Sequence, residues 1–306
     1  MRLIQSKAEL LTQGQGLLGI YKMIELAGRT CYKSEANITV DSAAEFVGRM
    51  IKSGHTAMLE HGTVYLLIPY WNSYDETDLA SFFRHNPYSK AWGPTEDSVN
   101  WHITTNYRVL VENNLVEKCK PYICAPTRHH SLRISMRFIT DRGVSHEIVR
   151  HRVFSFAQES TRYCNYSQEK FGNEITCIIP SWSNLIEGNS YDLDIARICD
   201  KSEGVSLQEQ GFLISLCTSE HQYLQLLNNG CSPQQARQVL PNALKTEIVV
   251  TGFISDWKHF FDLRYFGTTG KPHPDMLELT TKAKAVLEKA GLWGLIESER
   301  KNQHEN

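Results

Sequence analysis

The sequence lacks the features that mark membrane, secreted and repetitive proteins. No apolar run approaches the roughly 20 residues that a transmembrane helix requires. The first residues lack the apolar core and the small-residue cleavage site of a signal peptide. There is no internal repeat and no low-complexity tract. We therefore expect a globular protein of the cytoplasm without membrane contact.

An excess of one charge and a disulfide pattern are missing as well. The formal net charge is −2, with 32 Lys and Arg against 34 Asp and Glu, so no overall positive field favours DNA or RNA. The eight cysteines are scattered and form no CxxC pair. A chain of 306 residues can bury a large core without cross-links. Reduced thiols that serve as packing residues are the expected state.

Metal and nucleophile motifs are incomplete. His146-Glu147 begins an HExxH pattern, but Arg150 stands where the second histidine should be. The pair His129-His130 follows an arginine that would repel a cation. No cysteine follows a proline, and Cys164 has no evident base nearby. The sequence therefore predicts neither a metal centre nor a cysteine nucleophile.

A glycine pattern near the start is compatible with two structures. Gly14 to Gly19 reads GQGLLG, which matches GxGxxG. A dinucleotide-binding loop needs a strand directly before it, and residues 8–13 look helical or irregular. We therefore expect a turn before the first helix, and no Rossmann domain.

Hydrophobic periodicity predicts a mixture of strands and helices. Residues 64–69 and 132–140 are predicted strands; in the second, apolar residues alternate with polar ones. Ser42 with Glu45 fits a capping box, and Ser255 is predicted to cap a later helix. The predicted helices cover residues 17–28, 42–54, 207–229 and 274–291, with shorter ones after Ser232 and Ser255; the polar tail from Glu297 is expected to fray.

Arginines concentrate in one segment, Arg150 to Tyr163, which reads RHRVFSFAQESTRY. Helical periodicity fades at its start, which predicts a helix end running into a loop. Guanidinium forks suit phosphate, and serine adds a neutral donor. The alternative is a salt-bridged surface turn. Arg237 and Arg264 fall in apolar surroundings, where each must find an anion or a carboxylate such as Asp256 or Asp262.

The order RHR, seven residues, Ser, one residue, Arg-Tyr resembles the signature of the flavin-dependent thymidylate synthases. Gly54 to His61 upstream and two downstream segments, Ala236 to Pro241 and Trp257 to Arg264, resemble the same family. We therefore expect an α+β fold with a central, mostly antiparallel sheet flanked by helices, in a single domain over 1–306. Residues from about 71 to 127 have no counterpart in short family members. They are predicted as an ordered insertion with a strand near 101–111 and a helix near 114–119.

The resemblance implies an activity and its partners. dUMP would be methylated to dTMP with methylenetetrahydrofolate as carbon donor, and NADPH would reduce a bound FAD. The protein would be a homotetramer with active sites shared between subunits, and it would bind small molecules without a nucleic acid polymer. An RNA- or nucleotide-binding module that uses the arginine segment is the alternative.

The resemblance also assigns residues. Arg264 is implied as the catalytic residue, because a guanidinium beside uracil would stabilise negative charge that develops toward N3 and O4. Ser160 is implied as a ligand and not as a nucleophile. The implied dUMP-binding residues are Glu147, Arg150, Gln158, Glu159, Ser160, Thr161, Arg162, Arg237 and Arg264. The implied FAD-binding residues are His55, Arg150, His151, Arg152, Gln158 and His259.

Several positions differ from the family pattern. Glu147 stands where glutamine is common, and Ala157-Gln158 where many members have Asn-Glu. Phe253-Ile254-Ser255 and His259 stand where asparagines are common. These departures fall within the segments that would hold the flavin and the nucleotide.

Overall fold

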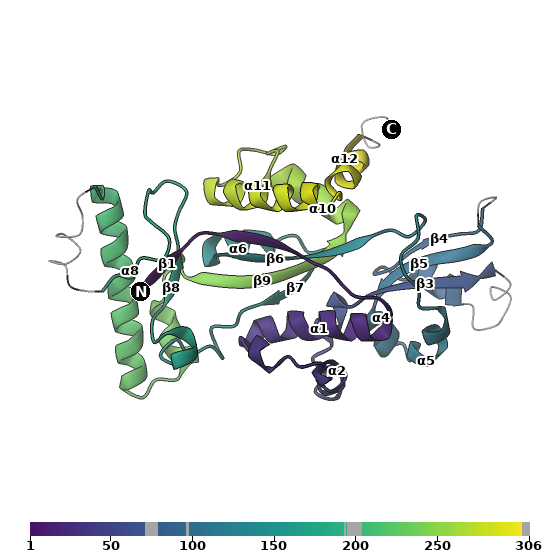
Figure 1. Ribbon diagram of the computed structural model, residues 1–306, viewed down its shortest axis with the longest axis horizontal. Coiled ribbons are helices and arrows are strands. Elements are labelled where there is room, and N and C mark those ends of the chain that lie inside the picture. The colour runs from purple at the N-terminus through teal and green to yellow at the C-terminus, as the bar shows by residue number, and fades with distance from the viewer. Residues whose placement is uncertain (71–78, 96–97, 193, 195–203, 302–306) are drawn as a thin grey trace.

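The computed structural model describes residues 1–70, 79–95, 98–192, 194 and 204–301. Within these ranges the strands form three sheets, ordered β2-β6-β9-β7, β3-β5-β4 and β1-β8 (Figure 1). Both larger sheets are antiparallel, and only the β1–β8 pair is parallel. The strands are β1 (Arg2–Ile4), β2 (Lys7–Leu11), β3 (Thr63–Pro69), β4 (Lys90–Trp92), β5 (Asn100–Asn106), β6 (Arg133–Asp141), β7 (Ser155–Gln158), β8 (Thr176–Ile178) and β9 (Lys245–Phe253).

Strand β9 is the centre of the main sheet. Its sequence is rich in β-branched residues, and seven consecutive residues from Thr246 to Gly252 are buried, as suits a strand covered on both faces. It pairs with β6 over nine residues, from Arg133 opposite Phe253 to Asp141 opposite Lys245. The expected α+β fold with a mostly antiparallel sheet and without a Rossmann domain is therefore confirmed.

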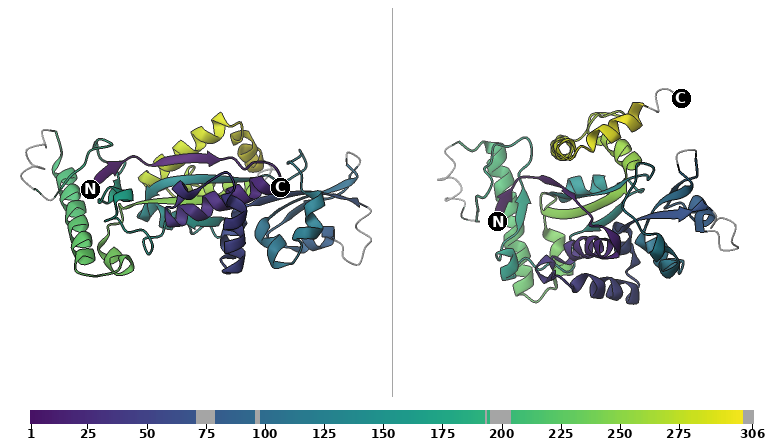
Figure 2. Two further views of the ribbon diagram at one scale, coloured as in Figure 1. Left: turned by 60° about the horizontal axis from the view of Figure 1, so that its bottom comes forward. Right: turned by 45° about the vertical axis from the view of Figure 1, so that its right-hand side comes forward.

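Helices cover both faces of this sheet (Figures 1 and 2). On one face, α10 to α12 bury an aromatic cluster that includes Trp257, Phe260, Phe261 and Trp293. On the other face, Ala27 of α1 packs against Val249 of β9. The helices are α1 (Gly16–Tyr32), α2 (Ser42–Lys52), α3 (Leu79–His85), α4 (Tyr107–Glu112), α5 (Val116–Cys119), α6 (Arg142–Ile148), α8 (Leu207–Asn228), α9 (Pro233–Ala236), α10 (Ile254–Arg264), α11 (Pro274–Lys289) and α12 (Trp293–Lys301), with 3-10 turns η1 (Glu35–Asn37), η2 (Thr56–His61), η4 (Lys120–Tyr122), η5 (Glu169–Phe171) and η6 (Arg237–Val239).

Two further cores lie at opposite ends of the main sheet. At one end, α8 and the β1–β8 pair surround Leu3, Leu213 and Tyr223. At the other end, the β3-β5-β4 sheet and α3 to α5 share a core with Ile20 and Ile24 of α1. The predicted insertion is thus ordered wherever it is described, because it contributes β4, β5 and three helices to that core; residues 71–78 and 96–97 lie outside the described ranges.

The glycine motif forms the turn that was expected before α1. Gly16 has a φ of +67°, and a Cβ on Gly19 would lie 1.9 Å from the carbonyl oxygen of Gly14, so the turn is too tight for a side chain there. The expectation that residues 8–13 are helical or irregular is wrong. They belong mostly to β2, whose KAELL sequence favours a helix; antiparallel pairing with β6 overrides that preference.

The predicted caps at Ser42 and Ser255 are wrong for the same reason, whereas Ser232 is the N-cap of α9 as predicted. The Ser42 hydroxyl donates to Glu25 Oε2 at 2.9 Å, and Glu45 pairs with Arg49, so no capping box forms. Helix α10 begins at Ile254, before Ser255, and the Asp256 carboxylate accepts the Phe253 N–H at 2.9 Å. In each case a tertiary partner takes the serine hydroxyl.

Two other boundaries also differ from prediction. The strand predicted over 101–111 ends at Asn106, whose side chain accepts the Val109 N–H and caps α4. The tail from Glu297 does not fray before Lys301, because Arg300 donates to Asp262 at 2.7 Å and lies 3.6 Å from the centroid of the Phe266 ring. The long helices predicted near the start and end of the chain are present as α1, α8 and α11.

Candidate active site

The RHR segment is a pair of turns that leads into a strand. Helix α6 ends at Ile148, whose carbonyl accepts the His151 N–H at 3.1 Å, and the Phe154 N–H donates to the His151 carbonyl at 3.2 Å. The predicted helix end running into a loop is thus found up to Phe154, but strand β7 then pairs with β9, which was not expected. Sequence reasoning missed β7 because four residues are too few to establish an alternation.

Phe154 anchors these turns to the main sheet. Its ring is 5% exposed and lies 4.6 Å from the Trp257 ring, centroid to centroid. A Cβ on Gly252 of β9 would lie 2.3 Å from Phe154 Cδ1, so only glycine permits this approach. With His151 and Phe154 buried, the side chains of Arg150 and Arg152 are left exposed.

The exposed arginines line a cavity of about 870 Å³ that we call the basic cavity. Arg150 and Arg152 form no ion pair with any residue that the structure describes, which leaves two guanidinium groups available to an anion. The cavity brings together six of the predicted site residues and the loop that follows α10. Its lining residues are Glu147, Arg150, His151, Arg152, Val153, His259, Leu263, Arg264 and Thr269 to His273.

Arg264 is fixed at the edge of the basic cavity by three contacts. Nη1 donates to Glu147 Oε2 at 2.6 Å, Nη2 donates to the Glu147 carbonyl at 3.1 Å, and Nε donates to His151 Nε2 at 3.1 Å. The sequence-based alternatives for its partner, Asp256 and Asp262, are wrong. Asp262 pairs with Lys258 and Arg300, and Asp256 caps α10.

His151 is held neutral by this arrangement. Burial, together with Arg264, His259 and Arg150, lowers its pKa to about 4. A neutral imidazole can accept the Arg264 N–H at Nε2, as the geometry requires. Arg264 and the neutral His151 together therefore carry one positive charge. This charge lies on Arg264 and is partly balanced by the Glu147 carboxylate.

A second space, which we call the inner cavity, lies next to the basic cavity. It measures about 320 Å³, and the two share Arg152 and Val153 as lining residues. Its lining combines η2 and the main sheet with the loop before β4, which belongs to the predicted insertion. The residues are Glu60, Pro87 to Lys90, Asn106, Arg133, Arg152 to Ser155, Gly252, Phe253 and Asp256.

Arg133 is the most unusual residue of the inner cavity. Burial lowers its pKa to about 10, and its Nε is buried without a hydrogen-bond partner. Nη1 reaches only the Glu60 carbonyl at 3.2 Å and Thr63 Oγ1 at 3.4 Å. Sequence reasoning placed Arg133 on the polar face of β6 and missed it as a site residue; an arginine at the start of a half-buried strand was the available signal.

The second half of the signature, residues 159–163, follows the other end of β7 and lines neither cavity. The Glu159 side chain is 1% exposed and accepts hydrogen bonds from Lys245 Nζ at 2.8 Å and Tyr166 Oη at 3.1 Å. Lys245 and Lys33 both pair with Glu247, and these two lysines offset its burial and lower its pKa to about 2. This ion network was not predicted.

The remaining predicted dUMP ligands surround that network. The Gln158 amide donates to Ser145 Oγ at 2.9 Å and to Thr246 Oγ1 at 3.2 Å. The Ser160 hydroxyl accepts the Arg162 N–H at 3.3 Å. Arg237 is exposed and contacts Thr161 Oγ1 at 3.4 Å, so its predicted apolar surroundings are wrong.

His55 stands apart from both groups. It is exposed, follows α2 through Gly54, and precedes the first residue of η2. Its N–H donates to the Met50 carbonyl at 3.0 Å, which completes the end of α2. Within one chain His55 lines neither cavity, whereas Glu60 of the same segment lines the inner one.

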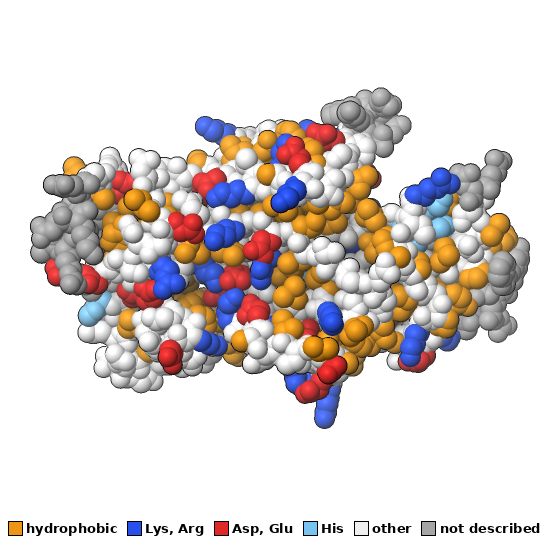
Figure 3. All heavy atoms as spheres, in the orientation of Figure 1, with side chains coloured by type: hydrophobic (Ala, Val, Ile, Leu, Met, Phe, Trp, Pro, Cys, Tyr) orange, Lys and Arg blue, Asp and Glu red, His pale blue; other side chains and the backbone are white. Residues whose placement is uncertain are grey.

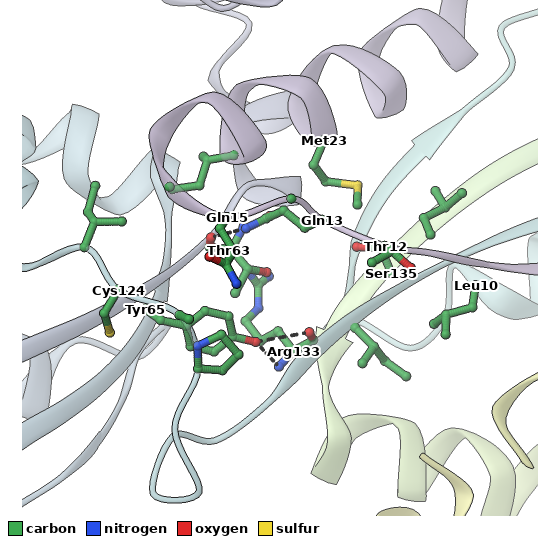
Figure 4. Close-up of a pocket in the computed structure, with 18 of the residues that line it drawn as sticks. Leu10, Thr12, Gln13, Gln15, Met23, Thr63, Tyr65, Cys124, Arg133 and Ser135 are labelled. Atoms are coloured by element: carbon green, nitrogen blue, oxygen red, sulfur yellow. Dashed lines mark hydrogen bonds between the residues drawn. The ribbon is translucent and has the colours of Figure 1, made fainter. Parts of the chain in front are cut away.

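A third pocket, of about 200 Å³, lies between β2, the start of α1 and β3 (Figure 4). Gln13 closes one side, because its amide donates to the Thr63 carbonyl and accepts the Thr63 N–H, both at 2.8 Å. Leu10, Met23 and Tyr65 contribute apolar surface. The glycine motif therefore joins β2 to α1 and β3, and the exposed arginines Arg150 and Arg152 do not reach this pocket.

Other chemistry finds little support among the described residues. Burial raises the pKa of Cys164 to about 12, so this thiol stays protonated at neutral pH. The seven described cysteines are free, and Cys199 lies outside the described ranges. No described group of three or more His, Cys, Asp or Glu could hold a metal ion. Figure 3 shows acidic and basic side chains interspersed on the face in view.

None of the helices in the described ranges is long and apolar enough to cross a membrane. The fold and the cavities define a mostly antiparallel α+β protein that gathers cationic side chains around a cavity of about 870 Å³. A sequence model described as thymidylate synthase complementing protein matches residues 113–289, more than half of the chain. The chain belongs to the thymidylate synthase complementing protein family, and the resemblance read from the RHR signature is confirmed.

Relatives with the name flavin-dependent thymidylate synthase match parts of the chain. The protein of Corynebacterium efficiens is 34% identical over 161 residues, 53% of this chain and 58% of the relative. That of Pyrococcus furiosus is 30% identical over 167 residues, 53% and 59% of the two chains. That of Mycobacterium tuberculosis H37Rv is 30% identical over 125 residues, 40% and 45%. The chain thus spans about half the length of these relatives.

Among solved structures, a UMP/dUMP methylase PolB from Streptomyces cacaoi bound with 5-Br dUMP aligns over 97% of both chains. The identity is 12% and the TM-score is 0.44. A likeness this weak carries no argument about the site.

Proposed function

We propose that this protein is a flavin-dependent thymidylate synthase. It would convert dUMP and methylenetetrahydrofolate into dTMP and tetrahydrofolate, with a hydride (two electrons and one proton) supplied by NADPH through bound FAD and a second proton taken from the solvent. Family membership supports the reaction class, and the names of the relatives support a flavin. FAD, the folate and the choice of NADPH are our proposals for this chain.

The basic cavity is the observation that carries the proposal. Arg150 and Arg152 are exposed there without a carboxylate partner among the described residues, whereas Arg264, which lines the same cavity, is paired with Glu147. Keeping several cations together costs free energy unless an anion neutralises them. A dinucleotide with two phosphates supplies that charge.

The residues fit an FAD that would extend over the two neighbouring cavities. Arg152 lines both of them, and Arg133 lines the inner one, so each would bring a guanidinium group to the cofactor. Arg150, His151, Arg152 and His259 would bind the cofactor, which supplies the hydride chemistry. Gln158 and His55 would join the site only where another subunit approaches, because in one chain they line neither cavity.

Arg264 would stabilise negative charge on the uracil ring. Glu147 and the neutral His151 hold its guanidinium in a fixed orientation, which is what electrostatic catalysis requires. Glu147 would then reach the nucleotide next to Arg264, although in the single chain its carboxylate is engaged by that arginine. Arg162, Arg237, Ser160 and Thr161 would bind the dUMP phosphate, and Glu159 would order that end through Lys245.

We further propose that the enzyme is a homotetramer whose active sites combine several chains, each chain being one domain over 1–306. Arg150 and Arg162 lie before and after β7, a strand of four residues that spans roughly 13 Å. Arg162 and Arg237 line neither cavity of their own chain. A second subunit would bring them to the basic cavity of its neighbour.

Purified protein tests this proposal directly. It should be yellow, release FAD and not FMN on denaturation, and form dTMP only when dUMP, methylenetetrahydrofolate, NADPH and flavin are all present. Omission of each component in turn is the control. A colourless protein that takes up no added FAD would favour the nucleotide-binding module and refute the enzyme.

A further inference from the structure

Among the residues that the insertion contributes to the inner cavity, Lys90 is the cation. Lys90 is the first residue of β4 in the insertion sheet, yet its Nζ donates to Ser255 Oγ of α10 at 2.6 Å. The same ammonium lies 4.7 Å from the centroid of the Phe253 ring at the end of β9. A cation from the insertion is thus held against the main sheet, at two of the positions where this sequence differs from the family pattern.

The inner cavity has two carboxylates, and neither forms an ion pair with Lys90, although burial raises the pKa of the Asp256 carboxyl and the Lys90 ammonium partly opposes that rise. Of its two carboxylates, Glu60 is paired with Arg108 at 2.6 Å, and Asp256 accepts the Phe253 N–H. Lys90 has no carboxylate within ion-pair distance in the part of the chain that the structure describes. Together with Arg133 and Arg152 it gives the cavity three positive groups.

We propose that Lys90 is a cofactor-binding residue that the insertion adds to the site, and that it contacts the diphosphate of FAD. This inference rests on the proposed function. An ammonium is a compact and strongly hydrated charge, which pairs better with phosphate oxygens than with a flat isoalloxazine ring. Ser255 and Phe253 hold the ammonium at the wall of the cavity, so little reorientation would be needed on binding.

The dissociation constant of FAD, measured by quenching of flavin fluorescence, tests the assignment. K90Q removes the charge and keeps most of the length, and it should weaken FAD binding about 10- to 100-fold, as expected for a lost charge-assisted hydrogen bond. K90R should retain most of the affinity. K118Q, on α5 of the same insertion and exposed, is the matched control and should bind FAD as the wild type does.

Riboflavin and inorganic pyrophosphate separate the phosphate contact from a general structural role. Riboflavin carries the ring without phosphate, so K90Q should bind it as well as the wild type does. Pyrophosphate should compete with FAD on the wild type and compete much less on K90Q. If K90Q loses riboflavin and FAD equally, or loses neither, the assignment of Lys90 is wrong.

Chemical acetylation provides a measurement on the unmutated protein. Saturating FAD should protect Lys90 from an amine-reactive acetylating reagent several-fold, riboflavin should not, and Lys118 should react equally in all samples. Equal labelling of Lys90 with and without FAD would overturn the inference even if K90Q proved unstable. A wild-type protein that binds no FAD would instead refute the proposed function itself, so the two failures are distinguishable.

Discussion

Arg264 uses all three of its guanidinium nitrogens inside the protein. Glu147 accepts from two of them and His151 from the third. The Arg264 guanidinium is therefore oriented before any substrate binds, but the Glu147 carboxylate partly neutralises its charge. A substrate with developing negative charge can gain from it only along the edge that faces the basic cavity. Arg264 is therefore expected to act on the transition state more than on substrate binding.

Replacement of Arg264 by alanine should impair dTMP formation while FAD stays bound. The loss of one fixed donor to a developing anion costs on the order of 2.7–4 kcal/mol, or about a hundred- to a thousand-fold in rate. R49A removes an exposed helix ion pair with Glu45 and is the matched control. Flavin content, thermal stability and dTMP formation should be measured on each variant. Normal turnover, or flavin loss together with unfolding, would contradict the assignment.

Buried neutral histidines should make stability depend on pH. Burial lowers the pKa of His151 and His102 to about 4 and that of His61 to about 3, all below the ordinary value near 6.5. Between about pH 4 and 6.5 the unfolded chain therefore binds more protons than the folded one. The stabilisation is complete above pH 6.5 and is lost as the pH falls toward 4.

Urea unfolding at pH 7, 6 and 5 measures this loss as a falling midpoint. H151Q should reduce the slope, because one of the buried neutral imidazoles is gone. H221Q removes an exposed histidine and should leave the slope unchanged. A midpoint that rises on acidification would show that these histidines gain protons on folding, contrary to their surroundings.

At the scale of elements, the close contact between Gly252 of β9 and Phe154 of the RHR turns leaves no space for a side chain at position 252. An alanine at Gly252 would place its Cβ 2.3 Å from Phe154 Cδ1, and overpacking of this kind typically costs about 1–3 kcal/mol. G252A should therefore lower thermal stability and weaken FAD binding, because the turns that present Arg150 and Arg152 must move. G211A in α8 meets nothing within 4 Å and should be neutral or stabilising. Unchanged FAD affinity in G252A would show that the turns do not depend on this contact.

The sequence predicts elements well where local signals and tertiary structure agree. The alternation in β6 and the long periodic helices α1, α8 and α11 are found as predicted. Strand β2 could not be predicted, because its residues prefer a helix and only pairing with β6 makes it extended. The serine caps failed because Glu25 and Lys90, distant in sequence, take the hydroxyl groups of Ser42 and Ser255.

The residues of the candidate site also fall into two groups: those that sequence spacing predicts and those whose role depends on tertiary contacts. Residue types at fixed spacing identified Arg150, His151, Arg152, His259 and Arg264, which the structure brings to one cavity. Spacing could not identify Arg133 or Lys90, because their significance depends on a buried, unpartnered nitrogen and on a contact between two sheets. Nor could it name Glu147 as the partner of Arg264, since Asp262 is closer in sequence but points to Lys258 and Arg300.

At the scale of the whole molecule, the signature serves two surfaces. Its first half faces the basic cavity of its own chain, and its second half, with Arg162 and Arg237, lies at the far end of β7. Under the proposed function, a single chain therefore presents two incomplete sets of phosphate-binding groups. Hydride transfer requires dUMP beside the flavin, so either another subunit joins the two sets or the segments at both ends of β7 move within one chain. The shared site is the arrangement that we propose.

Mixing two inactive variants distinguishes shared sites from self-contained ones. R162A and R264A should each lose dTMP formation when pure. If every site takes Arg162 from one subunit and Arg264 from another, co-refolding equal amounts should leave about one quarter of the sites with both arginines, because each is intact with a probability of about one half in a randomly assembled oligomer. Activity should then return to about 25% of wild type. If both arginines of a site come from one chain, the mixture stays inactive, since no chain carries the two together.

The R49A variant co-refolded with wild type is the control for losses during refolding. An inactive mixture that contains folded, flavin-loaded hetero-oligomers would refute the shared site and would require the two halves of the signature to meet within one chain by movement of the segments at both ends of β7.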